Sequence, residues 1–385
     1  MSPYLLVFLV SAGTVLLITP LVRRLAAKFG AIDRPSDRKV HPKPTPTLGG
    51  IGIFVGVLAA MGVAYFIPEF RRIYRQSFEL QGVLLGALVI TAVGVVDDLR
   101  ALSAPAKAAG QILAAGVLIL NGVELLFFWF PTQGVISLGS DLAVPLTVAW
   151  VLIMVNATNF IDGLDGLAAG IVAVAAGAFF VWVYVAPSTF SESASIAALL
   201  AAIAAGAAVG FLPYNFYPAR IFMGDSGAML LGLLLAASTV AGVGRTIQPT
   251  RGALAAFAIP VLIPLFVLAV PVVDVGMAIV RRIRRGRPIY APDKEHIHHQ
   301  LREIGHTHRR AVLTMYFWSL LLAGAGLAVS FVHDRAMVVL FLAFTVLLIG
   351  ASFIPRRLRE RRRLRSIQKA AGEAVSQAGA GPGSM

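Results

Sequence analysis

The amino-acid sequence is poor in two things, cysteine and charge. No cysteine occurs among the 385 residues, and Asp, Glu, Lys and Arg together make up only 14%. Without cysteine there is no disulfide framework, no thiol nucleophile and no cysteine-based metal site. The chain instead has 58% hydrophobic residues and a mean hydropathy of +0.81, well outside the balance of soluble globular domains. This composition predicts an integral membrane protein.

Long apolar runs recur along the whole chain. Because about 20 apolar residues cross a bilayer as a helix, the sequence predicts an all-α membrane protein with about eleven transmembrane helices, the fourth of them short. The predicted spans are residues 4–22, 48–67, 80–96, 107–120, 142–160, 167–187, 195–213, 226–243, 252–280, 311–331 and 337–354. The first is expected to be retained rather than cleaved as a signal peptide, because no basic residue precedes it and Arg23 and Arg24 follow it.

The distribution of Lys and Arg predicts the orientation, since these residues collect on the cytoplasmic side. With the N-terminus outside, most of the 33 basic residues fall in cytoplasmic segments, above all in residues 281–310 and 356–369. The C-terminus is then cytoplasmic too. We expect one membrane domain over residues 1–355, followed by a tail over residues 356–385 that is basic, then rich in Ala, Gly and Ser, and disordered at its end. The net charge of +14 suits anionic lipid headgroups, although the positive-inside rule is the simpler explanation and accounts for most of the arginine-rich tail.

A polar stretch closes the fifth apolar run. Four polar side chains follow one another there at three-residue spacing: Asn156, Asn159, Asp162 and Asp165. Each such step turns an α-helix by about 300°, so one continuous helix would aim the first and the last in opposite directions. Gly163 and Gly166 permit a break. Because polar groups are costly in hydrocarbon, we interpret the stretch as a membrane helix that ends in a polar surface loop; a capped helix end with turn residues is the alternative.

The other unusual polar segments fall on the same predicted cytoplasmic face. They are residues 39–47, 97–98 and 296–299, together with Asn215 and Asp225. A transporter is expected to place its polar groups near the bilayer midplane, on broken helices. The distribution therefore favours an active site at the cytoplasmic surface, although the three prolines within residues 252–280 leave a transporter open.

Asp97 and Asp98 stand where an apolar helix leaves the membrane. Adjacent carboxylates repel each other unless a cation lies between them, and Mg²⁺ binds carboxylate oxygens while keeping several waters. The alternative is a solvated helix end that pairs with Arg100. With three more aspartates expected on the same face, the pair is predicted to contribute to a metal or phosphate site.

Asp225 stands between Gly224 and Gly227 at the predicted start of the eighth span. The N–H groups of a helix N-terminus favour anions, and neighbouring glycines let a phosphate approach; Asp225 could equally be an N-cap.

His296, His298 and His299 lie in a long basic segment without regular zinc spacing, which favours phosphate contact over a transition metal. Together these groups predict phosphoryl transfer between one lipid-borne and one water-soluble reactant.

Five motifs, in order, resemble those of the polyprenyl-phosphate N-acetylhexosamine-1-phosphate transferases, glycosyltransferase family 4. They are Pro44–Gly50, Val96–Asp98, Asn156–Gly166, Phe222–Gly227 and His296–Leu301 with Gly305 after it. The resemblance covers roughly residues 4–355. Each motif alone is moderately specific, whereas all five in the same order are very hard to obtain by chance.

The resemblance implies a role for each matching residue. Asp225 is the best ligand for Mg²⁺, with Mn²⁺ as an alternative ion, and Asp98 is the second metal residue. The catalytic group comprises Asp97, Asp98, His298 and His299. The substrate-binding group comprises Asn159, Asp162 and Asp165 at the nucleotide, Phe222 on the uracil ring with Asn215 beside it, His296, and either Lys39 or Lys43 at the nucleotide phosphates.

The resemblance also implies the substrates. His298-His299-Gln300, where the MurNAc-pentapeptide translocases carry three histidines, and Asp274, which they lack, resemble the branch that uses UDP-GlcNAc. The implied reaction is transfer of GlcNAc-1-phosphate to a polyprenyl phosphate in a bacterial plasma membrane, with UMP as the second product. A MurNAc-pentapeptide or another UDP-N-acetyl sugar is the alternative donor. No nucleic-acid partner is expected, and a homodimer is left open.

Overall fold

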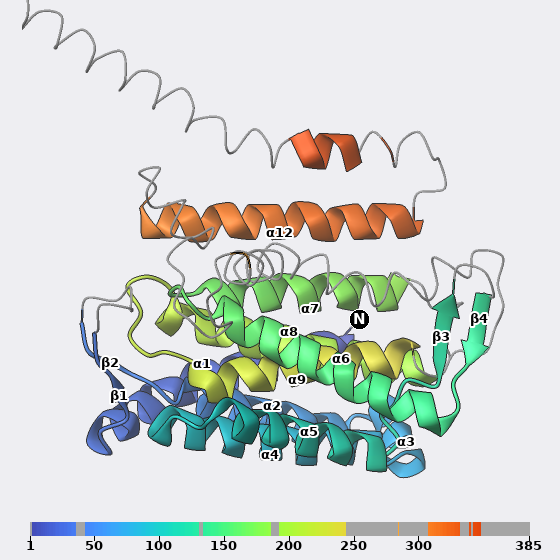
Figure 1. Cartoon of the computed structure of the whole chain (residues 1–385), viewed down its shortest axis with the longest axis horizontal. Coiled ribbons are helices and arrows are strands. Elements are labelled where there is room, and N and C mark those ends of the chain that lie inside the picture. Colours follow the sequence, from blue (N-terminus) through green and yellow to red (C-terminus); the bar gives the residue numbers. More distant parts are fainter. Residues whose placement is uncertain are drawn as a thin grey trace, which may run out of the picture. The chain divides into compact units, whose positions relative to one another are not determined.

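A computed structural model describes residues 2–35, 43–130, 134–185, 192–243 and 307–331, together with 284, 339 and 342–347. The chain divides into two compact units, Met1–Phe331 and Val332–Met385. In the first unit, apolar helices run roughly side by side (Figure 1). In the second, the described residues 339 and 342–347 are helical.

The described helices, with one exception, follow the predicted spans closely. They are α1 (Ser2–Lys28), α2 (Gly49–Phe66), α3 (Pro68–Gln76), α4 (Glu79–Arg100), α5 (Ala104–Leu120), α6 (Ser140–Ile161), α7 (Leu167–Val185), α8 (Glu192–Asn215), α9 (Gly224–Val243) and α12 (His308–Phe331). Eight of them are long and apolar enough to cross a membrane: all but α3 and α5. The short fourth span is confirmed as α5, with 17 residues. The predicted span 252–280 lies outside the described residues, as does most of 337–354.

Three structural features were not predicted. Two are antiparallel hairpins, β1 (Ile32–Asp33) with β2 (Thr45–Pro46) and β3 (Phe127–Phe130) with β4 (Gly134–Ser137). The third is α3, which has only nine residues. Its Phe70 and Ile73 are buried while its arginines point outward, so it is an amphipathic connector and not a span. A search for long apolar runs misses such short elements.

Helix α9 forms the centre of the described bundle. It packs against α2, α4, α6, α7 and α8. In its apolar stretch of 18 residues, 89% of the residues are buried. By contrast, only 28% of the residues in the corresponding apolar stretch of α1 are buried. The small side chains of α8 and α9 let neighbouring helices approach closely, which is how helices associate where no water drives them together. The central position of α9 makes its N-terminus the meeting point of several elements.

Glycines bring α2 and α4 into backbone contact with the first turn of α9. A Cβ atom on Gly94 of α4 would lie 2.3 Å from the Ser226 Cα, and one on Gly50 of α2 would lie 2.2 Å from the Gly227 nitrogen. Neither position has room for a side chain. The last turn of α4 is thereby held against the start of α9.

We predict that Gly94→Ala destabilises the protein, because the added methyl must push α4 away from α9. Overpacking of this kind costs about 1–3 kcal/mol. Gly62→Ala in α2 is the matched control, since a Cβ there meets nothing within 4 Å. This control should be neutral or up to about 1 kcal/mol stabilising. Thermal unfolding in detergent measures both, and equal melting temperatures for the two variants would contradict the proposed contact.

Candidate active site

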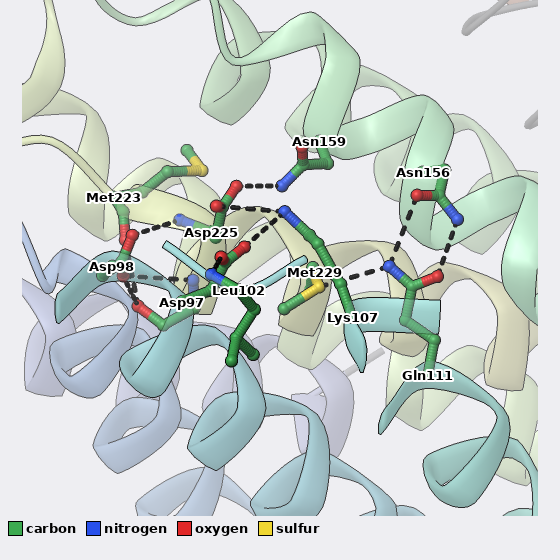
Figure 2. A network of polar contacts seen from close by, with 11 residues as sticks. Asp97, Asp98, Leu102, Lys107, Gln111, Asn156, Asn159, Met223, Asp225 and Met229 are labelled. Atoms are coloured by element: carbon green, nitrogen blue, oxygen red, sulfur yellow. Dashed lines mark hydrogen bonds and ion pairs between the residues drawn. The ribbon is translucent and has the colours of Figure 1, made fainter. Parts of the chain in front are cut away.

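The side chain of Asp98, in the last turn of α4, caps the N-terminus of α9. Its Oδ1 accepts the Asp225 N–H at 2.8 Å, and its Oδ2 accepts the Ser226 hydroxyl at 2.8 Å and the Ser226 N–H at 3.3 Å (Figure 2). A carboxylate is the preferred partner of these otherwise unpaired donors and of the helix dipole. The N-cap role that the sequence allowed for Asp225 therefore belongs to Asp98.

The first position of α9 requires glycine. Gly224 has a φ of +69°, and a Cβ on it would lie 2.4 Å from the Asp98 Oδ2. Any other residue would be strained there and would collide with the capping carboxylate. Gly224 therefore allows Asp225 to stand in the first turn of α9, beside Asp98.

A second group of charges joins α4, α5 and α9. The Lys107 Nζ lies 2.7 Å from the Asp97 Oδ2 and 3.0 Å from the Asp225 Oδ2 (Figure 2). The other oxygen of Asp97 accepts the Leu102 N–H at 2.7 Å. From α6, the Asn159 amide donates to the Asp225 Oδ1. The ammonium thus bridges two carboxylates that the chain brings in from different helices.

The short connection between α4 and α5 explains the position of Lys107. Helix α4 ends at Arg100 and is followed by its C-cap residue Ala101, which has a φ of +50°. Ser103 then caps α5 by accepting the Ala106 N–H at 3.4 Å. This tight turn places the first turn of α5 beside the last turn of α4. Lys107 consequently faces Asp97.

The predicted break in the Asn156–Gly166 stretch is confirmed. Helix α6 ends at Ile161, and Gly166 adopts a φ of +82° before α7 begins. In the loop between them, Asp165 Oδ2 accepts the Ala219 N–H at 2.9 Å. The Gly166 N–H donates to Asn215 Oδ1 at 3.1 Å. The loop is therefore joined to the segment between α8 and α9.

Other contacts support the same loops. Asn215 is buried and also donates to the Ile221 carbonyl at 3.1 Å, so its amide links two loops. The Tyr316 hydroxyl of α12 donates to the Gly166 carbonyl. Gly170 leaves room for the ring of Tyr316, because a Cβ there would lie 2.0 Å from the Tyr316 Cζ. Contact of Asn215 with a nucleotide stays a prediction.

Phe222 is half-buried beside the Pro44–Gly50 motif. Its N–H donates to the Pro46 carbonyl at 2.9 Å, and its carbonyl accepts the Gly49 N–H at 3.0 Å. Two motifs far apart in the sequence are thereby paired through their backbones. Lys43 lies just before this contact. Four predicted site residues lie outside the described residues, as does Asp274: Lys39, His296, His298 and His299.

Asp162, at the C-terminal end of α6, lies in a strongly acidic environment. Burial, and then the negative charges of Asp225, Asp98 and Asp165, raise its pKa to about 8. A bound cation would stabilise the ionised form of such a carboxyl group and so promote its ionisation.

We predict that Asp162 makes the stability of the metal-free protein depend on pH. An unfolded Asp has a pKa of about 4, whereas the folded pKa is about 8. Folding therefore takes up a proton between these values, and stability should fall as the pH rises from about 4 to about 8. Melting temperatures measured in EDTA should show this slope, Asp162→Asn should reduce it, and Mg²⁺ should flatten it. Parallel pH curves for the variant and the unaltered protein would contradict the prediction.

The donor chemistry of this cluster suits a hard cation such as Mg²⁺. Within the part of the chain that the structure describes, no three His, Asp or Glu side chains are arranged to hold a metal ion by themselves. Mg²⁺ does not require such a cage, because it is usually held by one or two carboxylates together with substrate phosphates. The side chain of Asp225 has an exposed fraction of 34%, against 7% for Asp97, so Asp225 presents the more accessible carboxylate.

The site contains four residues that were not predicted as site residues: Lys107, Gln111, Ser226 and Tyr316. Lys107 did carry a signal, since it is a cation in the first turn of an apolar helix, one turn before another polar residue, Gln111. Ser226 and Tyr316 contribute through hydrogen bonds to residues that are distant in the chain.

The fold and the site define a class of protein: a multi-pass membrane enzyme whose acidic site lies at one end of its helices. Comparison with known proteins gives the family. The model of glycosyl transferase family 4 matches residues 80–243. Decaprenyl-phosphate N-acetylglucosaminephosphotransferase of Mycobacterium tuberculosis (strain ATCC 25618 / H37Rv) is 39% identical over 87% of this chain and 84% of its own length.

Two further relatives extend the comparison. The probable undecaprenyl-phosphate N-acetylglucosaminyl 1-phosphate transferase of Bacillus subtilis (strain 168) is 38% identical over 80% of each chain. The undecaprenyl-phosphate alpha-N-acetylglucosaminyl 1-phosphate transferase of Salmonella typhi is 29% identical over 84% of this chain and 83% of its own length. The chain belongs to glycosyl transferase family 4, and the predicted resemblance is confirmed.

Proposed function

We propose that this enzyme transfers GlcNAc-1-phosphate from UDP-GlcNAc to a polyprenyl phosphate, the first lipid-linked step in the synthesis of a cell-envelope polysaccharide. The observation that carries the proposal is the cluster of Asp97, Lys107 and Asp225 at the end of a bundle of membrane-length helices. Such a cluster suits a charged diphosphate donor together with a lipid acceptor. The activities named for the relatives support the choice of both substrates.

The reaction balances as a phosphoryl substitution. A terminal oxygen of the polyprenyl phosphate attacks the phosphorus that carries GlcNAc, and the bond from this phosphorus to the bridging oxygen of the donor breaks. Polyprenyl-diphospho-GlcNAc forms and UMP leaves. A phosphate monoester has a second pKa of about 6, so the acceptor is largely dianionic at neutral pH. Asp97 is therefore assigned the orientation of the reactants, with a role as general base as the alternative.

Positioning and charge neutralisation would account for most of the rate. When bound, Mg²⁺, or Mn²⁺ in its place, would neutralise the developing charge on the phosphates. We assign Asp225 as its first ligand and Asp98 as the neighbouring carboxylate. Lys107 is assigned to hold Asp97 and Asp225 in register and to offer its ammonium to a phosphate.

The remaining substrate contacts follow the motifs. We assign Asn159, Asp162 and Asp165 to the nucleotide, Phe222 to the uracil ring with Asn215 beside it, and Lys39 or Lys43 to the nucleotide phosphates. His296, His298 and His299 are assigned to the diphosphate.

We also propose the predicted topology, with the N-terminus outside and the site and the C-terminal tail in the cytoplasm. The membrane domain then spans residues 1–355.

Release of UMP by the detergent-purified protein tests the proposal. The protein is given a polyprenyl phosphate and Mg²⁺, with UDP-GlcNAc and UDP-MurNAc-pentapeptide as parallel donors. UMP from UDP-GlcNAc alone is the expected result. UMP from the pentapeptide donor alone would move the chain to the translocase branch, and a folded sample inactive with a wider panel of UDP-sugars would overturn the proposal.

A further inference from the structure

Two side-chain amides pair inside the bundle, one helical turn away from the acidic cluster. Asn156 Nδ2 donates to Gln111 Oε1 at 2.8 Å, and Gln111 Nε2 donates back to Asn156 Oδ1 at 3.3 Å (Figure 2). Asn156 also donates to the Leu152 carbonyl at 2.8 Å, and Gln111 to the Met229 sulfur at 3.4 Å. The pair therefore joins α5 to α6 and also touches α9.

The apolar surroundings of this amide pair impose a free-energy cost. Gln111 has only 1% of its surface exposed, and both amides lie within apolar helices. A polar group in such surroundings costs free energy unless it is fully hydrogen-bonded. An apolar pair of similar shape would not carry this cost. Gln111 is buried and Asn156 is half-buried, so a polar pair at this position in a membrane protein is expected to have a function.

Each amide lies next to a residue of the acidic cluster. Gln111 follows Lys107 by four residues on α5, and Asn156 precedes Asn159 by three on α6, so each stands about one turn from its neighbour. Lys107 and Asn159 both contact Asp225, one at each carboxylate oxygen. The separation of α5 and α6 at the amide pair thus sets how the two side chains reach Asp225.

We infer that Gln111 and Asn156 are positioning residues, which fix α5 against α6 so that Lys107 and Asn159 hold the Asp225 carboxylate from two sides. The two amides contribute no contact to the substrates. Their exchange of hydrogen bonds has a single register, because each donates to the other's oxygen, whereas an apolar contact would let the helices slide. The inference rests on the proposed function only in taking Asp225 as the metal ligand.

The test replaces each amide with an apolar side chain of similar size. Gln111→Met and Asn156→Leu each leave the other amide without its partner across the two helices. Each single variant should lower kcat for UMP release and weaken Mn²⁺ binding by about 10–100-fold, the usual cost of disturbing groups that orient a metal ligand. Mn²⁺ binding to the nucleotide-free protein is measured by electron paramagnetic resonance. Because it needs no donor substrate, this measurement remains informative even if UDP-GlcNAc is not the donor.

The double variant Gln111→Met/Asn156→Leu separates positioning from stability. It leaves no unpaired amide, so its melting temperature should recover toward that of the unaltered protein while kcat and Mn²⁺ affinity stay low. A double variant in which all three quantities recover would overturn the inference. The exchange variant Gln111→Asn/Asn156→Gln keeps both amides and their combined length, and it should be several-fold more active than either single variant.

Trp150 and Thr239 provide the matched control. The Trp150 Nε1 donates to Thr239 Oγ1 at 2.7 Å, a buried bond that joins α6 to α9 away from the acidic cluster. Trp150→Phe removes this bond and should lower the melting temperature while leaving kcat and Mn²⁺ affinity unchanged. If Trp150→Phe lowered kcat as much as the amide variants do, the inferred role would be reduced to general helix packing and the inference would fail.

Discussion

Asp225→Asn is expected to abolish UMP release, with a loss of at least about 10²–10³-fold, the range found when a single electrostatic contact to a transition state is removed. Asn has nearly the same shape as Asp and keeps one oxygen, so the turn at the start of α9 should persist. The negative charge that faces Lys107 and the proposed metal ion disappears, however. Both UMP release and Mn²⁺ binding should therefore be lost when they are assayed, while the melting temperature changes little.

Asp141→Asn is the control for this prediction. Asp141 is also an acidic residue in the first turn of an apolar helix, α6, but it is exposed and stands at the opposite end of that helix from Asn159. The control should keep its activity. Asp225→Asn with normal turnover would remove Asp225 from the metal site.

Asp97→Asn extends the same test to the second carboxylate of the cluster. It should also abolish turnover, because Asp97 orients Lys107 and accepts the Leu102 N–H. Near-normal turnover in this variant would exclude Asp97 as a general base while leaving a metal site at Asp225 intact.

Lys107→Met is the second prediction with a large expected effect. The change keeps the length and much of the volume of the side chain but leaves Asp97 and Asp225 without the ammonium that lies 2.7 and 3.0 Å from their oxygens. Removing one partner of a partly buried ion pair leaves uncompensated charge behind. We expect kcat to fall by about 10²-fold and the melting temperature to fall with it.

Two further measurements make the test of Lys107 specific. Lys107→Arg keeps the positive charge and should retain more activity than Lys107→Met, although the planar guanidinium does not reproduce the geometry of an ammonium. Added Mg²⁺ should raise the melting temperature of Lys107→Met more than that of the unaltered protein, because a divalent cation then supplies the missing charge. Normal turnover in Lys107→Met would contradict a role at the site.

Much of the membrane architecture could be predicted because it depends on local sequence. The length of an apolar run decides whether a helix can cross a bilayer, and each predicted span within the described residues, such as 142–160 for α6, corresponds to a helix of the structure. The helix break before Leu167 could also be predicted, since Gly163 and Gly166 stand where the polar stripe would otherwise turn away. Both inferences need only residues that are neighbours in the chain.

Roles that depend on distant partners could not be predicted in the same way. The motifs assigned Asp98 to a metal and to catalysis, but no local pattern shows that its oxygens also cap a helix that begins at Gly224. Nor does a local pattern show that Lys107 turns toward Asp97, or that Gln111 pairs with Asn156. Helix α3 was missed for a different reason, because its nine residues are too few and too charged to resemble a span.

The sequence by itself determined that this protein resides in a membrane, where most of its spans lie, and which family chemistry its aspartates serve. These properties follow from hydrophobic length and from motifs whose residues are close together in the chain. The tertiary structure alone decided which side chains share a charge or a hydrogen bond: Lys107 with two carboxylates, Asp98 with the start of α9, and Gln111 with Asn156. The physical reason is that Coulomb attraction and hydrogen bonds act over a few ångströms in space, and only the packing of α4, α5, α6 and α9 brings these groups that close.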